Sequence, residues 1–440
     1  MVLRCGQREK ALAASAYRRP RWFMPMRVML AHKFMFRGGG TSTYLFGLID
    51  QLEQRGHTWT PFTVAYERTA VDTCSEYFVS PPLGQDQSHY RQMRMSPIAM
   101  LKLLGRATYS LETRRKATAL IRDQRPDIAY VHNVYNYMSP SLLHSCRDAD
   151  LPVVMRVPDY NLICPELHFL RHGEVCTECL RSGPWHALKH RCLKDSFAAT
   201  AARVVSMYVH DWLNIYDGVR LMITPSAFMR SKLIEAGYDA ERIVHLPSFF
   251  TGAIGAGNGA PDDDYVLYFG RVAPEKGIDT LIRALALLDH PPRLLIAGGT
   301  VDDTQEQLAE LVRQLGLDCV EFVGHQDREA LDDLIRRCMF TIVPSRWYDN
   351  CPMSILESFA LGKTVVASDI GGIPEQVADG CGALFAPDDP ESLAAAMTPL
   401  LSDASLRRAM GRAALRRLQH DFSPDAHCDR LLELFEELIA

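Results

Sequence analysis

The sequence predicts an α/β protein made of two doubly wound domains, each with a parallel sheet covered by helices on both faces. The first observation is an alternation of short apolar runs of strand length with amphipathic segments of helix length. The second is Pro247–Asp264, which is rich in Gly and small residues and is typical of a linker. The third is the restart of the alternation at Tyr265. Two such domains face each other across a cleft, which is the default place for a ligand.

In the first half, the apolar run Arg27–Ala31 is followed by a loop ending in Gly38–Gly40 and by an amphipathic segment that Gly56 ends. Ser226 is a predicted N-cap, and Cys74–Arg106 has no clear periodicity and is interpreted as irregular. The predicted strands are Arg27–Ala31, Trp59–Tyr66, Asp127–His132, Val153–Val157, Leu221–Pro225 and Ile243–Leu246. The predicted helices are Thr41–Arg55, Leu111–Gln124, Phe197–Tyr216 and Ala227–Ala236.

In the second half, Pro352 opens a helix that Gly362 ends, because a residue in the first turn needs no donor. The predicted strands are Tyr265–Gly270, Arg293–Gly298, Cys319–Val323, Cys338–Pro344 and Thr364–Ser368. The other predicted helices are Ile278–Leu288, Thr304–Leu315, Arg328–Arg337, Pro390–Leu401, Ser405–Leu418 and Pro424–Leu438.

These elements divide the chain into an N-terminal domain (residues 26–246), a linker (247–264) and a C-terminal domain (265–420). We expect the last helix, within residues 421–440, to pack back on the N-terminal domain. Residues 1–25 are basic and lack the apolar segment of a secretory signal, so we interpret them as a disordered extension. A basic arm of this kind can also touch an anionic membrane.

Composition excludes some classes of protein. With 440 residues and 47% hydrophobic content, the chain can bury large cores. The net charge of −5 is spread along the chain, so nucleic acid is not an expected partner. No apolar run reaches the roughly 18–20 residues of a membrane-spanning helix. Reduced thiols in the cytoplasm are therefore expected for the 12 cysteines.

Four cysteines gather in an insertion-like segment, residues 164–192, with the spacing C-x11-C-x2-C-x12-C. The central C-x-x-C pair is a familiar half of a tetrahedral zinc site, and four thiolates complete such a site. The presence of a single C-x-x-C pair argues against zinc. Structural zinc and free thiols both remain open for Cys164, Cys176, Cys179 and Cys192.

Polar residues follow two predicted strands of the first domain. His132 ends one strand, and Asp159-Tyr160 follows the next. Because ligands bind at the carboxyl ends of such strands, these residues are candidates for the site, although a lone His at a strand end is often structural. Backbone N–H groups near Gly38–Gly40 can bind an anion at the start of the helix, or the glycines can simply permit the turn.

Cations and acids gather at the corresponding edge of the second domain. Arg271 and Lys276 follow its first strand, and these side chains suit phosphate oxygens. Asp349 lies in the loop after the strand Cys338–Pro344, and Glu357 lies in the next helix. Carboxylates accept hydrogen bonds from sugar hydroxyls. The combination indicates a site for a nucleotide sugar.

These motifs resemble glycosyltransferase family 4 on the GT-B fold, which consists of two Rossmann-like domains facing a cleft. The resemblance is strongest over Tyr265–Ala386, in Arg271 to Lys276, Ser345–Glu357 and the turn GGIPE at Gly371–Glu375. The family motif at Asp349 to Glu357 is Glu, seven residues, Glu. The first half, with GGGTSTYLFGLIDQLEQRGH and the Asp159-Tyr160 stretch, resembles bacterial surface-polysaccharide members, some of which carry the same Cys-rich segment.

The resemblance implies a retaining transferase acting on a nucleotide-diphosphate-sugar donor, with a hexose the expected sugar. Arg271 and Lys276 would hold the diphosphate, Glu357 the ribose, and Asp349 the donor sugar. The departing phosphate would serve as base, so no protein nucleophile is implied. The wider donor-binding set that the resemblance implies is Gly39, Gly40, Asn350, Cys351, Pro352 and Met353. Apart from the resemblance, the positions of His132, Asp159 and Tyr160 after strands make them candidates for contacts with the acceptor or the sugar.

Two departures from the family pattern leave alternatives open. Asp349 replaces a Glu and is one methylene shorter, and Pro158 stands where relatives usually have a His that contacts the donor sugar. A catalytically degenerate sugar-nucleotide-binding protein is therefore one alternative. A nucleotide-sugar epimerase on the same fold is another, although Asp349 and Glu357 argue against it.

The expected partners and cofactors follow from the same reading. The acceptor would be a glycan or a lipid-linked glycan, and the protein would be cytoplasmic, with contact to the inner face of the membrane. Asp148 and Asp150 precede a strand rather than follow one, and Asp262–Asp264 belongs to the linker, so neither is interpreted as a metal-binding Asp-x-Asp. We predict that catalysis requires no cofactor and no divalent cation, with zinc at the cysteines as the one metal to consider.

Overall fold

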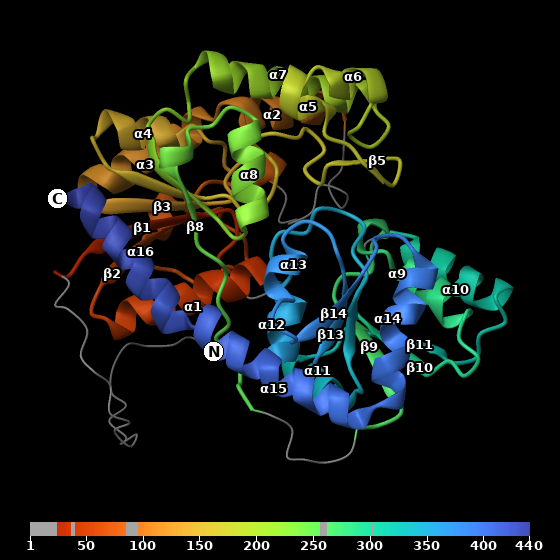
Figure 1. Cartoon of the computed structure of the whole chain (residues 1–440). Coiled ribbons are helices and arrows are strands. Elements are labelled where there is room, and N and C mark those ends of the chain that lie inside the picture. The colour runs from red at the N-terminus through yellow and green to blue at the C-terminus, as the bar shows by residue number, and fades with distance from the viewer. Residues whose placement is uncertain (1–23, 37–39, 85–95, 256–261, 301) are drawn as a thin grey trace.

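The computed structural model describes residues 24–36, 40–84, 96–255, 262–300 and 302–440. It contains two six-stranded parallel sheets with helices on both faces, which confirms the predicted fold class (Figure 1). The strand orders are β2-β1-β3-β4-β7-β8 and β11-β10-β9-β12-β13-β14. Gly39, most of the predicted basic extension and residues 256–261 of the predicted linker lie outside the described residues.

The first half follows the predicted alternation, with boundaries shifted by a few residues. Its strands are β1 (Arg27–His32), β2 (Thr58–Phe62), β3 (Ile128–His132), β4 (Val153–Arg156), β7 (Val219–Thr224) and β8 (Ile243–His245). Its main helices are α1 (Gly40–Gln54), α2 (Pro97–Thr108), α3 (Leu111–Gln124), α4 (Leu142–Asp148), α7 (Phe197–Trp212) and α8 (Ala227–Glu235).

The second half repeats the pattern and ends in three helices. Its strands are β9 (Tyr265–Phe269), β10 (Arg293–Ala297), β11 (Val320–Gly324), β12 (Thr341–Val343), β13 (Val365–Ser368) and β14 (Gly382–Phe385). Its helices are α9 (Ile278–Leu285), α10 (Thr304–Gln314), α11 (Arg328–Arg337), α12 (Met353–Ala360), α13 (Ile373–Gln376), α14 (Pro390–Ser402), α15 (Ala404–Asp421) and α16 (Pro424–Ile439).

Several elements were not predicted. The irregular interpretation of residues 74–106 was wrong from Pro97 onward, where α2 begins with Ser96 as N-cap, its Oγ accepting from the Ala99 N–H at 3.1 Å. The pattern of α2 is weak because its exposed face is also apolar. The Cys-rich segment forms a small antiparallel pair and two short helices. These elements are β5 (Leu170–Arg171), β6 (Glu174–Val175), α5 (Glu178–Ser182) and α6 (His186–His190).

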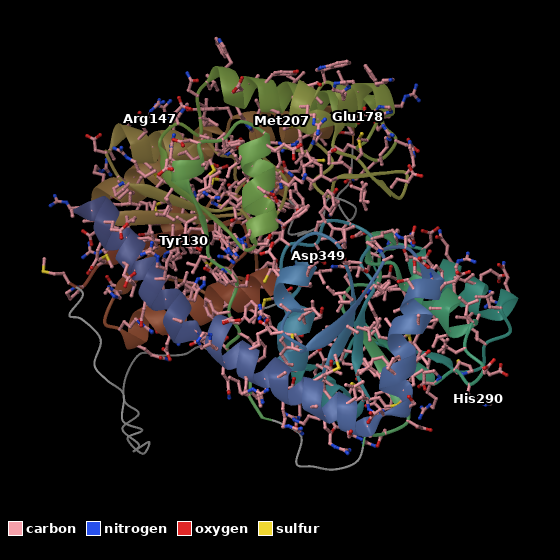
Figure 2. All side chains as sticks on the ribbon, viewed as in Figure 1. Tyr130, Arg147, Glu178, Met207, His290 and Asp349 are labelled. Atoms are coloured by element: carbon pink, nitrogen blue, oxygen red, sulfur yellow. The ribbon has the colours of Figure 1, made fainter. Side chains whose placement is uncertain are left out.

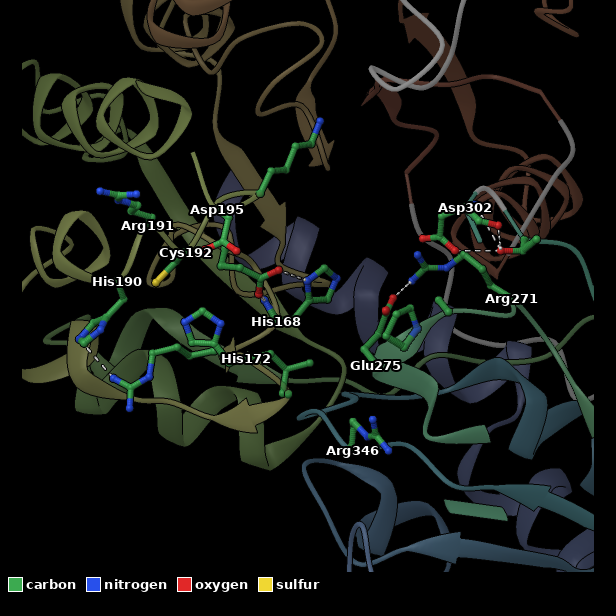
Figure 3. Close-up of a pocket in the computed structure, with 18 of the residues that line it drawn as sticks. His168, His172, His190, Arg191, Cys192, Asp195, Arg271, Glu275, Asp302 and Arg346 are labelled. Carbon is green, nitrogen blue, oxygen red and sulfur yellow. Dashed lines mark hydrogen bonds and ion pairs between the residues drawn. The ribbon is translucent and has the colours of Figure 1, made fainter. Parts of the chain in front are cut away.

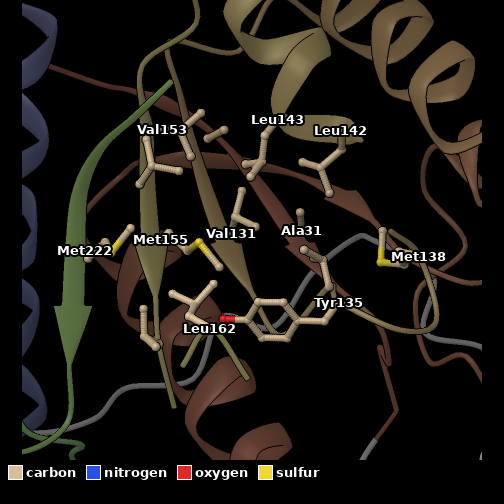
Figure 4. Close-up of a cluster of buried hydrophobic side chains, with 14 of the residues drawn as sticks. Ala31, Val131, Tyr135, Met138, Leu142, Leu143, Val153, Met155, Leu162 and Met222 are labelled. Carbon is tan, nitrogen blue, oxygen red and sulfur yellow. The ribbon is translucent and has the colours of Figure 1, made fainter. Parts of the chain in front are cut away.

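Alternation along β1 explains why both faces of the first sheet are covered. Met29 and Ala31 belong to the core on one face, and Val28 and Leu30 belong to the core on the other. Figure 4 shows the first of these cores, where Ala31 lies among side chains of the neighbouring strands. The second sheet is likewise buried on both faces.

The chain passes between the halves twice. At the first crossing, two consecutive residues belong to different cores: Phe249 is buried in the first half and Phe250 in the second. At the second crossing, α16 returns to lie beside α1 (Figure 1). Arg55, directly after α1, forms ion pairs with two residues of α16, Asp425 at 2.9 Å and Asp429 at 3.0 Å. The halves are therefore joined by packed side chains as well as by the backbone.

The packing of α16 gives a stability prediction. Phe435 is fully buried in the core beneath the first sheet, with its ring centroid 5.8 Å from that of Tyr130. We expect Phe435→Ala to destabilise the first half by about 3–5 kcal/mol, because it leaves a cavity in a packed core. Urea denaturation measures the effect. The control, Ile439→Ala on the exposed end of the same helix, should cost less than about 0.5 kcal/mol; equal costs would contradict the assigned packing.

Candidate functional site

The candidate residues lie where the carboxyl ends of the two sheets meet. Arg271 and Lys276 follow β9, and the loop Ser345–Pro352 follows β12, its neighbour in the second sheet. Figure 2 shows Asp349 at the boundary between the two halves. This is the cleft edge that the strand order predicts.

Lys276 and Asp349 form an ion pair, with Lys276 Nζ 2.6 Å from Asp349 Oδ2. Ser345 Oγ donates to the same oxygen at 3.3 Å. Arg271, on the same loop as Lys276, is half exposed and bonds Glu275. The structure therefore brings Lys276 and Asp349 into contact, with Arg271 on the same loop as Lys276.

Glycines allow the segments of this site to approach closely. Gly277 has a φ of 64°, and a Cβ there would collide with the Pro344 carbonyl. Gly371 also has a φ of 64°, and a Cβ there would press on the Asp349 backbone. Gly372 N–H donates to Asp349 O at 2.8 Å. Asp349 is thus held from both sides and is only 7% exposed.

Glu357 lies further along, on α12, and faces α11 instead of the Lys276–Asp349 pair. Its Oε1 is 3.3 Å from Arg328 NH1. Burial raises the pKa of Glu357, and the Arg328 guanidinium offsets part of that rise. Burial makes the charged form of Glu357 unfavourable, and Arg328 is the cation beside it. Hydroxyl groups that donate hydrogen bonds to this carboxylate would stabilise its charged form.

The next residues of the loop contact the first half of the chain. Asn350 accepts from Tyr160 OH at 2.5 Å and donates to the Pro158 carbonyl at 3.0 Å. Cys351 is half-buried, and burial raises the pKa of its thiol. Pro352 is the N-cap of α12, and Met353 is its first residue. The hydrogen bond between Tyr160 and Asn350 therefore joins the two halves directly.

His132 lies at the end of β3 and is buried beside His32, with ring centroids 5.0 Å apart. Neither ring nitrogen of His132 has a hydrogen-bond partner among the described residues. Burial, followed by the neighbouring His32, lowers the pKa of His132 well below its ordinary value, so the ring is neutral. Asp159 Oδ1 accepts from Asn161, so its carboxylate is partly satisfied locally. Gly40 begins α1.

Two further contacts near the boundary between the halves were not predicted. Glu375 of the GGIPE turn accepts from the Ala227 and Phe228 N–H groups, both at 2.7 Å, and so caps the start of α8. Arg156 is buried at the end of β4, lies 4.0 Å from the Tyr44 ring centroid and donates to Ser248 Oγ at 2.8 Å. The sequence signal for the Glu375 contact is an acid in a Gly-rich turn. The sequence shows no signal for the contacts of Arg156.

A cavity of about 840 Å³ opens between the Cys-rich segment and the loop of Arg271. Figure 3 shows His168, His190 and Arg191 on one side and Arg271 and Glu275 on the other. The Cys-rich segment therefore forms one wall of the cavity next to the candidate site. This position of the segment was not predicted from the sequence.

The four cysteines of this segment are free thiols. Burial raises the pKa of Cys164 to about 12 and that of Cys179 to about 11. In the part of the chain that the structure describes, no three His, Cys, Asp or Glu side chains are grouped to hold a metal ion.

Glu357 gives a pH prediction. Its pKa is higher in the folded chain than in the unfolded chain, so folding takes up a proton between these values and stability falls as pH rises through that interval. We expect Glu357→Gln to unfold at a higher temperature than wild type at neutral pH, with the difference shrinking towards about pH 4. Thermal unfolding across pH measures this. Glu436→Gln, at an exposed carboxylate of α16, should show no such trend; equal curves for Glu357→Gln and wild type would refute it.

Comparisons with known proteins agree with this architecture. Relatives include D-inositol 3-phosphate glycosyltransferase of Jonesia denitrificans, 35% identical over 188 residues, covering 40% of this chain and 44% of the relative. The match to glycogen synthase of Mycobacterium tuberculosis is 35% identical and covers 36% of this chain and 38% of that protein. The chain thus spans less than half the length of these relatives. An uncharacterized glycosyltransferase of Methanocaldococcus jannaschii is 24% identical, covering 92% of this chain and 93% of that one.

Solved structures share the fold. Anabaena HepE, in complex with UDP and glucose, has a TM-score of 0.61 at 17% identity, covering 93% of this chain and 99% of that one. Sucrose-phosphate synthase from Thermosynechococcus elongatus has a TM-score of 0.67 at 18% identity, covering 94% and 99%. Within the described residues, none of the helices is both long enough and apolar enough to cross a bilayer.

Two family patterns divide the chain at the boundary that the fold shows. The glycosyl transferase 4-like domain matches residues 39–248, and the glycosyl transferases group 1 domain matches residues 254–417. Together they account for most of the chain. The chain therefore combines a glycosyl transferase 4-like domain with a glycosyl transferases group 1 domain.

Proposed function

We propose that the chain is a retaining glycosyltransferase that moves a hexose from a nucleotide-diphosphate-sugar donor to a glycan or lipid-linked acceptor. The observation that carries the proposal is the ion pair between Lys276, on the loop that also carries Arg271, and the buried Asp349, held between two glycine turns. A cation and a carboxylate 2.6 Å apart place phosphate binding and sugar binding next to each other.

In this proposal Arg271 and Lys276 bind the diphosphate. Both side chains come from one short loop after β9, so they approach a ligand from the same side. As the bond to the sugar breaks, negative charge grows on the phosphate, and two cations stabilise it more than they stabilise the intact donor. Arg271 can exchange its bond to Glu275 for phosphate oxygens because its side chain is half exposed.

Glu357 and Asp349 bind hydroxyl groups. Glu357 would accept hydrogen bonds from the ribose hydroxyls. Its pKa is raised because the carboxyl group is buried, and ribose, being uncharged, can replace the water that burial excludes. Asp349 would accept from the donor sugar while it stays paired with Lys276. That ion pair also lowers the tendency of Asp349 to attack carbon, which supports a route without a protein nucleophile.

Retention then follows if the acceptor approaches from the face that the phosphate leaves. The departing phosphate takes the proton of the acceptor hydroxyl, so its charge is neutralised as the new bond forms. The relatives are consistent with a nucleotide donor: HepE was solved with UDP-glucose, and several relatives are D-inositol 3-phosphate glycosyltransferases. We also propose a cytoplasmic location and no cofactor for catalysis. Zinc at the cysteines remains a hypothesis for metal analysis.

A second candidate is a sugar-nucleotide-binding protein without transfer activity. It is favoured by Pro158, whose carbonyl accepts from Asn350 and so serves the contact between the halves. Nucleotide binding without product from any of a panel of donors and acceptors would support this reading. Free epimerised sugar formed without an acceptor would instead indicate an epimerase.

Nucleotide binding provides the most direct test. We expect a panel of nucleoside diphosphates and their sugars to raise the unfolding temperature of the wild type in a thermal-shift screen. Arg271→Ala should weaken that binding about tenfold or more, because it removes charge-assisted hydrogen bonds. Arg293→Ala, at an exposed arginine of the same domain, is the control and should bind as wild type. A wild type that no nucleotide stabilises would refute the assigned site.

The stereochemistry and the metal requirement can be tested together. With a competent donor and acceptor, we expect NMR of the product to show the anomeric configuration of the donor, and EDTA to leave the rate unchanged. Zinc content is measured in the same samples so that loss of structural zinc is not mistaken for loss of a catalytic ion. Inversion of configuration, or activity lost to EDTA and restored by magnesium, would contradict this mechanism.

A further inference from the structure

Helix α7 has its polar face turned inward and its apolar face turned outward. Thr200, Ser206 and His210 are buried together with one apolar residue, Val204, and His210 Nε2 lies 2.8 Å from the Thr108 carbonyl of α2. The exposed side chains recur at helical spacing and are apolar or aromatic, with Asp211 as the one charged exception on this helix. They are Phe197, Val205, Tyr208 and Trp212, and Trp212 is 79% exposed. Helices of soluble domains have the opposite arrangement.

The apolar face extends onto neighbouring elements, and we call the whole the α7 face. On one side, the space beside Gly183 is bordered by Tyr208 OH and by Trp185, which is half exposed. On the other side, α2 packs on α7 and exposes Ile98 and Leu101. Figure 1 shows α7 on the outer edge of the first half, beside α5 and α6. A patch of this extent on a soluble domain indicates an interaction surface.

Cations border the α7 face. Residues 181–196, which lead into α7, contain four Lys and Arg, all exposed, and one acid, Asp195, which is also exposed. Helix α2 adds an exposed lysine, Lys102, and has no acidic residue. Apolar and aromatic side chains next to exposed cations match a bilayer with anionic headgroups, where Trp and Tyr prefer the interface. A second copy of the chain would bring two cationic borders together, which is unfavourable.

We infer that the α7 face docks this protein on an anionic lipid bilayer. The inference rests on the proposed function in one respect: Arg191 and Lys194 belong to the cationic border and also line the cavity beside Arg271. Docking would therefore bring the cavity to the membrane surface, where a lipid-linked acceptor is held. The acceptor class that the proposed function leaves open then narrows to the lipid-linked kind.

Vesicle flotation tests the inference on the full chain. We expect the wild type to float with vesicles of phosphatidylcholine and phosphatidylglycerol, not with phosphatidylcholine alone, and to be released by salt. Replacing two exposed apolar residues, in Val205→Ser with Trp212→Ser, should weaken binding about tenfold or more. Lys189→Glu should weaken it about tenfold. Leu287→Ser, at an equally exposed apolar residue of the second half, is the matched control and should bind as wild type.

Two results would overturn the inference. One is vesicle binding that is absent in the wild type or unchanged in the double variant. The other is a wild-type dimer in light scattering that the double variant converts to a monomer, since the α7 face would then belong to a second copy. Thermal shift with nucleoside diphosphates is measured on the same samples. The double variant should keep the nucleotide response of the wild type, and a wild type with no response would implicate the proposed donor site instead of the α7 face.

Discussion

The candidate site depends on the close approach of three backbone segments at the carboxyl edge of the second sheet. Gly277 lies against the Pro344 carbonyl, and Gly371 and Gly372 lie against the backbone of Asp349 and Asn350. A side chain at any of these glycines would push the loop Ser345–Pro352 away. The ion pair between Lys276 and Asp349 exists because these contacts place the loop within reach of Lys276.

The same loop also holds the two halves together. Asn350 bonds Tyr160 and Pro158, and the Tyr348 ring lies 4.7 Å from the Phe228 ring. Glu375, from the turn that supports Asp349, caps α8 in the first half. The geometry of the donor residues and the relative position of the halves are therefore coupled, so a ligand that moves the loop also acts on the domain interface.

The first half supplies buried polar groups to the boundary. Arg156 contacts Tyr44 and Ser248, and His132 is neutral and unpaired among the described residues. Ser248 comes just before Phe249 and Phe250, which enter different cores. Arg156 thus holds the start of the segment that crosses between the halves. This segment was predicted as a linker, but its first residues are packed against both cores.

The alternation of apolar runs was enough to predict both sheets, because strand and helix periodicities are local properties of the chain. It also predicted that Arg271, Lys276 and Asp349 share an edge, because parallel strands end on the same side. It could not predict that Lys276 pairs with an acid 73 positions away or that Glu375 caps a helix that starts 148 positions away. Nor could it tell which face of α7 is buried. Periodicity reveals a stripe, but the packing partner decides whether that stripe faces the core, and that partner is chosen by contacts between residues distant in the sequence.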